Sequence, residues 1–257
     1  MITCRHVVCN TECSEFGHLG DLFWSLCFMK YLNQPIELFL ECRDGINFEQ
    51  VKRVLILQSY IDRVVPRSNL GVDYDLTDSN RCDTSVCLLD SYFDTYNVQR
   101  PDHRVGWLAD TSTEKHGTMI YRNTRYRNPN FDWAYYIRNE SIDLNDCFFV
   151  GKHHEYIQFL IAAKLRPSEL VWQKTNTLMD LYNTVCGAKN VICNAGLPYV
   201  IAAGLGKRVV LENSNRANSP FLMLIDDEER PVNVHNVMNR DSSIYYQTYN
   251  PKRIVKL

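Results

Sequence analysis

The chain has 257 residues, enough for one large domain or two small ones with substantial cores. Its hydrophobic content of 45% and charged content of 23% are those of a folded globular protein and argue against a disordered or fibrous chain. The net charge of -2 supplies no overall positive field, so charge alone does not indicate a nucleic-acid partner.

The ten cysteines include no C-x-x-C pair and no matched histidine pair, so we expect no structural zinc and no other bound metal. The chain starts Met-Ile-Thr-Cys-Arg-His, which is not a signal-peptide pattern, and no apolar run approaches the ~18 residues that span a bilayer. We therefore expect a cytoplasmic protein with free thiols and no membrane span.

The first hundred residues alternate between strand and helix patterns. Helices are expected at 22–32, where apolar residues recur at helical spacing, and after Asn47, a good N-cap residue. Strands are expected at 3–9, 36–40 and 61–65, with a further strand or extended edge at 72–76 and a helix within 84–96. This order predicts a parallel sheet with helices on its faces.

The same alternation restarts after the polar segment 99–103, which is the expected junction between two halves. Strands are expected at 118–121, 147–151 and 170–172, and helices at 131–137, 154–164 and 177–186, the last capped by Thr175 or Asn176. The segment 190–212 completes the series as strand, turn, small-residue helix and strand. Weaker patterns follow at 221–225 and 244–249.

Two β/α halves predict an α/β protein with two Rossmann-like lobes whose parallel sheets face a central cleft. The amino-terminal lobe is expected over 1–104. The carboxyl-terminal lobe is expected over 105–257, with its tail packed back on the body.

A G-x-x-G-D run, formed by Gly17, Gly20 and Asp21, precedes the first expected helix. Its glycines allow a tight turn and a close approach to a ligand, and the helix dipole favours a carboxylate there by about 0.3–1 kcal/mol. Asp21 is therefore either a cap of the helix or a general base within reach of a substrate hydroxyl. The run lacks the third glycine of the dinucleotide-binding fingerprint, and no P-loop motif is present.

A basic loop follows the strand at 118–121 and contains Arg122, Asn123, Thr124, Arg125 and Arg127. One guanidinium group can donate two hydrogen bonds to two oxygens of a phosphate, and Asn and Thr side chains add neutral donors. The loop is either a phosphate site or a solvated basic surface.

The Asn194-Ala195-Gly196 turn places a helix N-terminus at the carboxyl end of a strand, where free N–H groups and the helix dipole favour an anion. It is either a diphosphate site or a turn that supports the helix. Glu212, at the end of the next strand, is a candidate for binding ribose hydroxyls or an ordinary strand end. The adjacent His153 and His154 point to different sides of a helix, so a shared metal ion is not expected.

Two stretches together resemble a known family. Gly17-x-x-Gly20-Asp21-Leu22, followed by an apolar helix, resembles the amino-terminal motif of the ADP-heptose:lipopolysaccharide heptosyltransferases, glycosyltransferase family 9. The segment 191–209 resembles that family's D-[ST]-G-x-x-H-x-A-A-A-L-G-x-P motif. Between them, the loop 121–129 and the run 148–155 are similar to its phosphate loop and G-x-x-x-E positions.

The resemblance implies a GT-B fold and a metal-independent, inverting transfer with no cofactor, in which Asp21 is the base and the second lobe holds the donor. The donor- or phosphate-binding residues expected on this basis are Gly17, Gly20, Asn123, Thr124, Arg125, Arg127, Asn194, Ala195, Gly196, Tyr199 and Glu212.

The chain departs from the family pattern at three positions: Asn194 replaces an Asp, Tyr199 replaces a His and Arg208 replaces a Pro. Asn and Tyr still donate hydrogen bonds, so a phosphate site remains expected, whereas ADP-heptose and lipopolysaccharide are less expected as substrates.

The leading hypothesis is a glycosyltransferase that uses a nucleotide-sugar donor and an acceptor that is a saccharide, a small molecule or a modified nucleic acid. One alternative is a non-catalytic module that binds a nucleotide or nucleotide sugar. Another is a phage or viral transferase that modifies nucleic acid through the aromatic loop 121–136.

Overall fold

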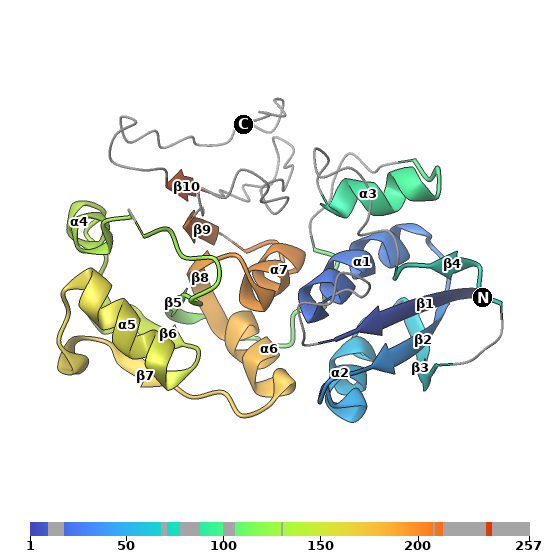
Figure 1. Ribbon diagram of the computed structural model, residues 1–257, viewed down its shortest axis with the longest axis horizontal. Coiled ribbons are helices and arrows are strands. Elements are labelled where there is room, and N and C mark those ends of the chain that lie inside the picture. Colours follow the sequence, from blue (N-terminus) through green and yellow to red (C-terminus); the bar gives the residue numbers. More distant parts are fainter. Residues whose placement is uncertain are drawn as a thin grey trace. The chain divides into compact units, whose positions relative to one another are not determined.

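The computed structural model describes residues 1–9, 18–67, 71–77, 88–99, 106–129, 131–207, 209–212 and 235–237 (Figure 1). The chain forms two compact units that divide between Asp110 and Thr111. Each unit contains a parallel sheet with helices, so the predicted α/β class is confirmed. The boundary predicted after residue 104, most of the junction 99–103 and the patterns at 221–225 and 244–249 lie outside the described residues.

The first unit contains a four-stranded sheet in the order β3-β2-β1-β4, in which every neighbouring pair is parallel. Its elements are β1 (Ile2–Val8), α1 (Leu19–Tyr31), β2 (Ile36–Cys42), α2 (Phe48–Leu55), β3 (Ile61–Pro66), β4 (Tyr74–Asp75) and α3 (Leu88–Thr95). The expected cap is confirmed, because the Asn47 side chain accepts a hydrogen bond from the Gln50 backbone N–H at 3.1 Å. The expected edge strand is confirmed as β4.

Helix α1 is the core helix of this unit, because all its residues from Leu22 to Met29 are buried. A helix that is apolar on every side needs partners on every side. The Phe28 and Phe93 rings meet edge to face at 5.4 Å where α3 packs on it, and the Trp107 indole donates to the Phe23 carbonyl oxygen at 3.1 Å. These contacts hold α1 firmly and thereby fix the position of its first turn.

The second unit contains a six-stranded sheet in the order β10-β9-β8-β5-β6-β7, again with parallel neighbours. Its strands are β5 (His116–Tyr121), β6 (Cys147–Val150), β7 (Val171–Gln173), β8 (Ala188–Asn194), β9 (Val209–Glu212) and β10 (His235–Val237). Its helices are α4 (Trp133–Asn139), η2 (Leu144–Asp146), α5 (His153–Ala163), η3 (Pro167–Glu169), α6 (Leu178–Gly187) and α7 (Leu197–Gly204).

Helices cover both faces of this sheet. On β7, the Trp172 ring packs against His153 of α5, whereas the next residue, Gln173, donates to the Thr184 hydroxyl of α6 at 3.3 Å. Successive strand residues point to opposite faces, so α5 and α6 lie on opposite faces.

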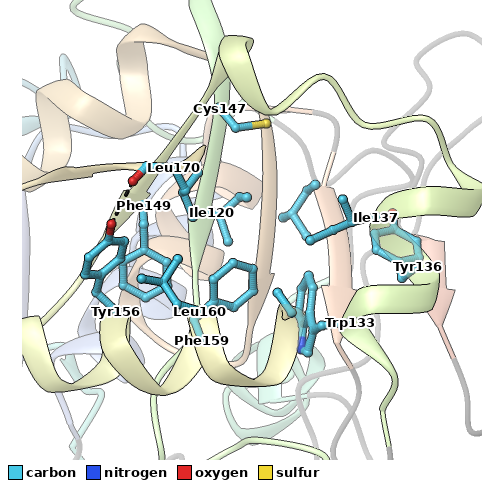
Figure 2. Close-up of a cluster of buried hydrophobic side chains, with 12 residues drawn as sticks. Ile120, Trp133, Tyr136, Ile137, Cys147, Phe149, Tyr156, Phe159, Leu160 and Leu170 are labelled. Carbon is cyan, nitrogen blue, oxygen red and sulfur yellow. Dashed lines mark hydrogen bonds between the residues drawn. The ribbon is translucent and has the colours of Figure 1, made fainter. Parts of the chain in front are cut away.

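Aromatic side chains dominate the core under α4 and α5 (Figure 2). Trp133 of α4 and Phe159 of α5 meet edge to face at 4.9 Å, and Phe149 of β6 packs on Phe159 at 5.4 Å. The Tyr156 hydroxyl donates to the Leu170 carbonyl oxygen at 2.7 Å, so this buried phenol is satisfied. The packing fixes the positions where β5 and β6 end.

Two predicted details differ from the structure. The cap of α6 is Thr177, not Thr175 or Asn176, because its hydroxyl accepts the Asp180 N–H at 3.0 Å while Asp180 accepts the Thr177 N–H at 3.0 Å. This reciprocal Thr-x-x-Asp box satisfies two otherwise free donors. Strand β10 was not predicted, because His235-Asn236-Val237 carries a single apolar residue and so shows no strand pattern.

Seven of the ten cysteines lie among the described residues, and all seven are free thiols. In the same part of the chain, no helix combines the length and apolarity needed to cross a membrane.

His6 is a fully buried titratable group in the middle of the first sheet. Its Nδ1–H donates to the Val7 carbonyl oxygen at 3.1 Å, and its Nε2 has no partner within the described ranges. Burial lowers the pKa of His6 to about 4, because the charged ring would lose its hydration, although the Val7 carbonyl and Asp75 act in the opposite direction. The folded unit therefore holds this ring neutral.

We predict that the first unit loses stability as the pH falls from 6.5 towards 4. Unfolded His6 takes up a proton below its ordinary pKa, whereas folded His6 does so only near 4, so acid favours the unfolded state. At 1.36 kcal/mol per pKa unit, the full loss is about 3 kcal/mol. This loss of stability is measured by urea titrations at several pH values, in which pulsed hydrogen exchange of the β1 segment follows the unfolding of the first unit.

The His6→Gln variant should lose this part of the pH dependence, because its side chain does not titrate. The matched control is His116→Gln, since the His116 side chain is 71% exposed. An unchanged pH slope in His6→Gln would contradict the assignment.

Candidate functional site at the carboxyl edge of the second sheet

The carboxyl ends of the central strands of the second unit lie at one edge of the sheet. Tyr121, the last residue of β5, is in register with Cys193 of β8 and Val150 of β6, and Asn194 is in register with Glu212 of β9. The loop after β5 and the turn after β8 are therefore neighbours, although they are far apart in sequence. In parallel α/β sheets, this edge is where ligands bind.

A buried ion pair holds the base of the loop after β5. Arg122 donates from Nε and Nη2 to the two carboxylate oxygens of Glu212, at 2.7 and 2.8 Å. The Asn128 N–H donates to the same carboxylate at 2.8 Å, and the Asn128 carbonyl oxygen accepts from Arg122 at 3.2 Å. Both ends of the segment 122–128 are thus fixed to the end of β9, and its middle part projects from a rigid base.

Asn123 and Asn194 form a second, reciprocal link. The Asn194 carboxamide accepts the Asn123 backbone N–H at 2.9 Å and donates to the Asn123 carbonyl oxygen at 2.8 Å. The Asn123 side chain donates to the Ala195 carbonyl oxygen at 2.5 Å and accepts the Tyr126 N–H at 2.9 Å. Asn194 is fully buried, so these bonds form away from competing water.

Gly196, the N-cap of α7, lies directly against this link. Its φ is 157°, and a Cβ atom there would lie 3.0 Å from Asn123 Nδ2 and 3.1 Å from the Tyr121 hydroxyl oxygen. Only glycine fits without a shift of these groups. Since glycine has no side-chain acceptor, it leaves the first turn of α7 without a side-chain cap from its own N-cap residue.

The side chains that project outward from the loop are polar or basic. Thr124, Arg125 and Arg127 are exposed, and the Arg125 guanidinium lies 5.0 Å from the centre of the Tyr126 ring. The edge therefore combines a braced loop carrying two exposed guanidinium groups with a glycine-capped helix N-terminus. Both features favour an anion.

Glu155 and Tyr121 add to the same edge. Glu155, in the first turn of α5, accepts the Lys152 N–H at 2.9 Å. Burial raises the pKa of the Tyr121 phenol above its ordinary value, the hydrogen bond from Asn123 acts against this, and the Glu155 charge adds to it. Tyr121 therefore stays a neutral hydroxyl beside the α7 N-cap.

In the first unit, Asp21 occupies the third position of α1. Its carboxylate accepts the His18 N–H at 2.6 Å, which is a capping bond, and its backbone carbonyl oxygen accepts the Tyr92 hydroxyl at 3.1 Å. Asp21 is half-buried, as is Gly20 in the same turn. The capping interpretation of Asp21 thus has a direct observation behind it, and the base role remains a prediction. Gly17 lies outside the described residues.

The structure brings most of the predicted donor residues together in the second unit, but not in the expected way. Asn194 and Glu212 are buried and hold other parts of the protein, because their side chains pair with Asn123 and Arg122 instead of facing outward. Tyr199 is fully buried in α7, and Ala195 is also buried. Contacts from these four side chains to a ligand would require local opening.

Sequence reasoning missed the structural roles of Tyr121 and Asn128. Tyr121 is the last residue of β5, and this terminal position was its only sequence signal. Nothing local marks Asn128, whose backbone N–H donates to Glu212 of β9.

Among the described residues, no group of three or more His, Cys, Asp and Glu side chains is placed to bind a metal ion.

No protein-family model matches the chain, and no curated protein matches it by sequence. Solved structures do match. The E. coli heptosyltransferase WaaC with ADP-2-deoxy-2-fluoro heptose has a TM-score of 0.52 and 11% identity, over 82% of this chain and 88% of that one. A glycosyl transferase of family 9 from Veillonella parvula has a TM-score of 0.53 and 12% identity, over 80% and 79%.

The E. coli ADP-heptose lps heptosyltransferase II has a TM-score of 0.53 and 10% identity, over 86% of this chain and 88% of its own. The chain therefore shares the fold of these glycosyltransferases, and the resemblance inferred from the motifs is confirmed at the level of the fold. At such identities, likeness carries no residue role across.

We predict that Arg122→Met destabilises the second unit by about 3–5 kcal/mol, because it leaves the Glu212 carboxylate buried without its counter-charge. The double variant Arg122→Met/Glu212→Leu should recover much of this loss, since neither charge remains. Urea unfolding of the variants measures both effects.

The control is Arg166→Met in the same unit, which breaks the exposed pair with Glu169 and should change the unfolding free energy by about 0–1 kcal/mol. A double variant as unstable as the single one would show that the braced geometry, not the unpaired charge, dominates.

Proposed function

We propose that the protein is a glycosyltransferase that transfers a sugar from a nucleotide-sugar donor to a hydroxyl acceptor. The observation that carries this proposal is the braced basic loop beside the N-cap of α7, in a chain that shares the fold of glycosyltransferases. Three of the neighbouring structures are described with ADP or an ADP-sugar, and the geometry of this edge favours a diphosphate.

In this proposal, the second unit binds the diphosphate of the donor. Arg125 and Arg127 supply charge, Thr124 supplies a neutral donor, and the N-terminus of α7 adds the positive end of its helix dipole. As the sugar leaves, negative charge grows on the diphosphate, and groups already held in place stabilise it without reorganisation. The chemistry needs no metal, since two guanidinium groups supply the positive charge.

Asp21 is proposed as the general base that takes the proton of the acceptor hydroxyl. The hydroxyl oxygen then bonds to the anomeric carbon from the side opposite the departing nucleoside diphosphate, which inverts the configuration of the sugar. Its capping bond with the His18 N–H holds the carboxylate in one orientation, and an ionised carboxylate has acceptor sites beyond that one. The cytoplasmic location stays a prediction.

We predict that replacing Arg125 and Arg127 together by Ala lowers the affinity for nucleoside diphosphates at least tenfold, because each lost charge-assisted bond is worth about 1.5–3 kcal/mol. Isothermal titration with ADP and UDP measures the effect. The control is Lys189→Ala, an exposed cation at the opposite end of β8. Equal losses in the two proteins would mean that the effect is one of overall charge.

We predict that Asp21→Asn lowers the rate of transfer about 10²–10⁴-fold, the usual contribution of a general base, with little change in donor affinity. The substitution keeps an oxygen that accepts the His18 N–H, so the helix cap survives. A coupled assay of nucleotide release, with titration of the donor, separates the two effects.

The control is Asp180→Asn, because Asp180 has the same capping position in α6 and should leave the rate unchanged. Unchanged turnover in Asp21→Asn would refute the base role. Donor binding without turnover in the wild-type protein would favour a non-catalytic binding module, and steeply salt-dependent binding of DNA or RNA would favour a transferase that modifies nucleic acid.

A further inference from the structure

The side-chain carboxamide of Asn194, at the end of β8, forms hydrogen bonds with both backbone groups of Asn123 in the loop after β5. It accepts from the Asn123 N–H at 2.9 Å and donates to the Asn123 carbonyl oxygen at 2.8 Å, the two bonds that a neighbouring strand would make. In effect, the side chain extends the pairing of β8 with β5 by one residue beyond Tyr121 and Cys193, where the strand register ends.

This double contact needs a group that donates and accepts at the same time. A carboxamide has both functions on one plane, whereas a carboxylate only accepts. A carboxylate at this place would keep the bond from the Asn123 N–H but would set a negative oxygen against the Asn123 carbonyl oxygen, in a fully buried position. An Asp, which the family 9 motif carries at this position, could therefore not form both of the hydrogen bonds that Asn194 forms.

The contact is passed on to the helix N-terminus. The Asn123 side chain donates to the Ala195 carbonyl oxygen at 2.5 Å, and its Nδ2 lies where a Cβ atom of Gly196 would be crowded, at 3.0 Å. Its Oδ1 accepts the Tyr126 N–H at 2.9 Å, which shapes the turn that carries Thr124 and Arg125. One pair of carboxamides thus sets the position of the basic turn relative to the start of α7.

We propose that Asn194 is a positioning residue, not a ligand-binding one: its carboxamide clamps Asn123 so that the basic turn and the N-terminus of α7 bind one diphosphate together. The inference rests on the proposed function for the identity of the ligand. Asn194 itself stays buried and touches no substrate.

The test uses the full-length protein with inorganic pyrophosphate as the probe, because pyrophosphate carries no base or sugar preference. Asn194→Ala removes both bonds and should weaken binding about tenfold at any pH. Asn194→Asp should weaken binding as much or more at about pH 8, where the introduced carboxyl is ionised. Near pH 5 its affinity should approach that of the wild type, because the protonated form regains a donor and burial favours that form.

Each variant is compared with the wild type at the same pH, so the titration of pyrophosphate cancels. The matched control is Asn190→Asp, the same change on the same strand, where the carboxamide donates to the Thr118 hydroxyl at 3.4 Å. Its affinity should equal that of the wild type at both pH values. Thermal unfolding confirms that each variant is folded at the temperature of the titration.

A second measurement needs no variant. The clamp predicts slow hydrogen exchange at the Asn123 and Tyr126 amides of the wild type before any ligand is added.

Wild-type affinity in folded Asn194→Ala, or a loss in Asn194→Asp that is the same at both pH values, would overturn the clamp. Fast exchange at Asn123 in the free protein would do so as well. Failure of the wild type to bind pyrophosphate, ADP and UDP would instead overturn the proposed function, while the exchange result would still report on the clamp.

Discussion

The ion pair between Arg122 and Glu212 is the constraint on which the carboxyl edge of the second sheet depends. Two charges lie in the interior, where each alone would be costly, and they are tolerated because the carboxylate accepts three N–H donors in a fixed geometry. The pair gives a loop without regular structure a rigid base. It also removes one negative charge from the edge where an anion is proposed to bind.

The ion pair between Arg122 and Glu212 both fixes the loop after β5 and neutralises the carboxylate of Glu212. The Glu212 charge is neutralised by Arg122, and Asn194 carries no charge. Glu155 caps α5. The exposed charges of the loop are therefore those of Arg125 and Arg127. Preorganised positive groups beside a helix N-terminus suit a leaving diphosphate better than mobile ones, because little reorganisation is needed as charge develops.

The order of strands and helices could be predicted from the sequence, because it depends on periodicity and on local caps such as Asn47. The location of the site at the carboxyl edge followed from that order. The roles of Asn194 and Glu212 could not be predicted, because their partners, Asn123 and Arg122, are set by strand order and register. Both side chains have the chemistry of a ligand-binding group, and only the tertiary structure shows that each forms hydrogen bonds with another part of the chain.

The two links that brace the edge join residues 71 and 90 positions apart in the chain. Contacts of such sequence separation form only after the intervening segments have been ordered, which makes them late events in folding. The segment 122–128 is synthesised early in the second unit but acquires its shape only when β8 has paired with β5 and β9 with β8. Its conformation therefore reports that this part of the sheet is complete, and a nascent or truncated chain that ends before β9 lacks the brace from Glu212.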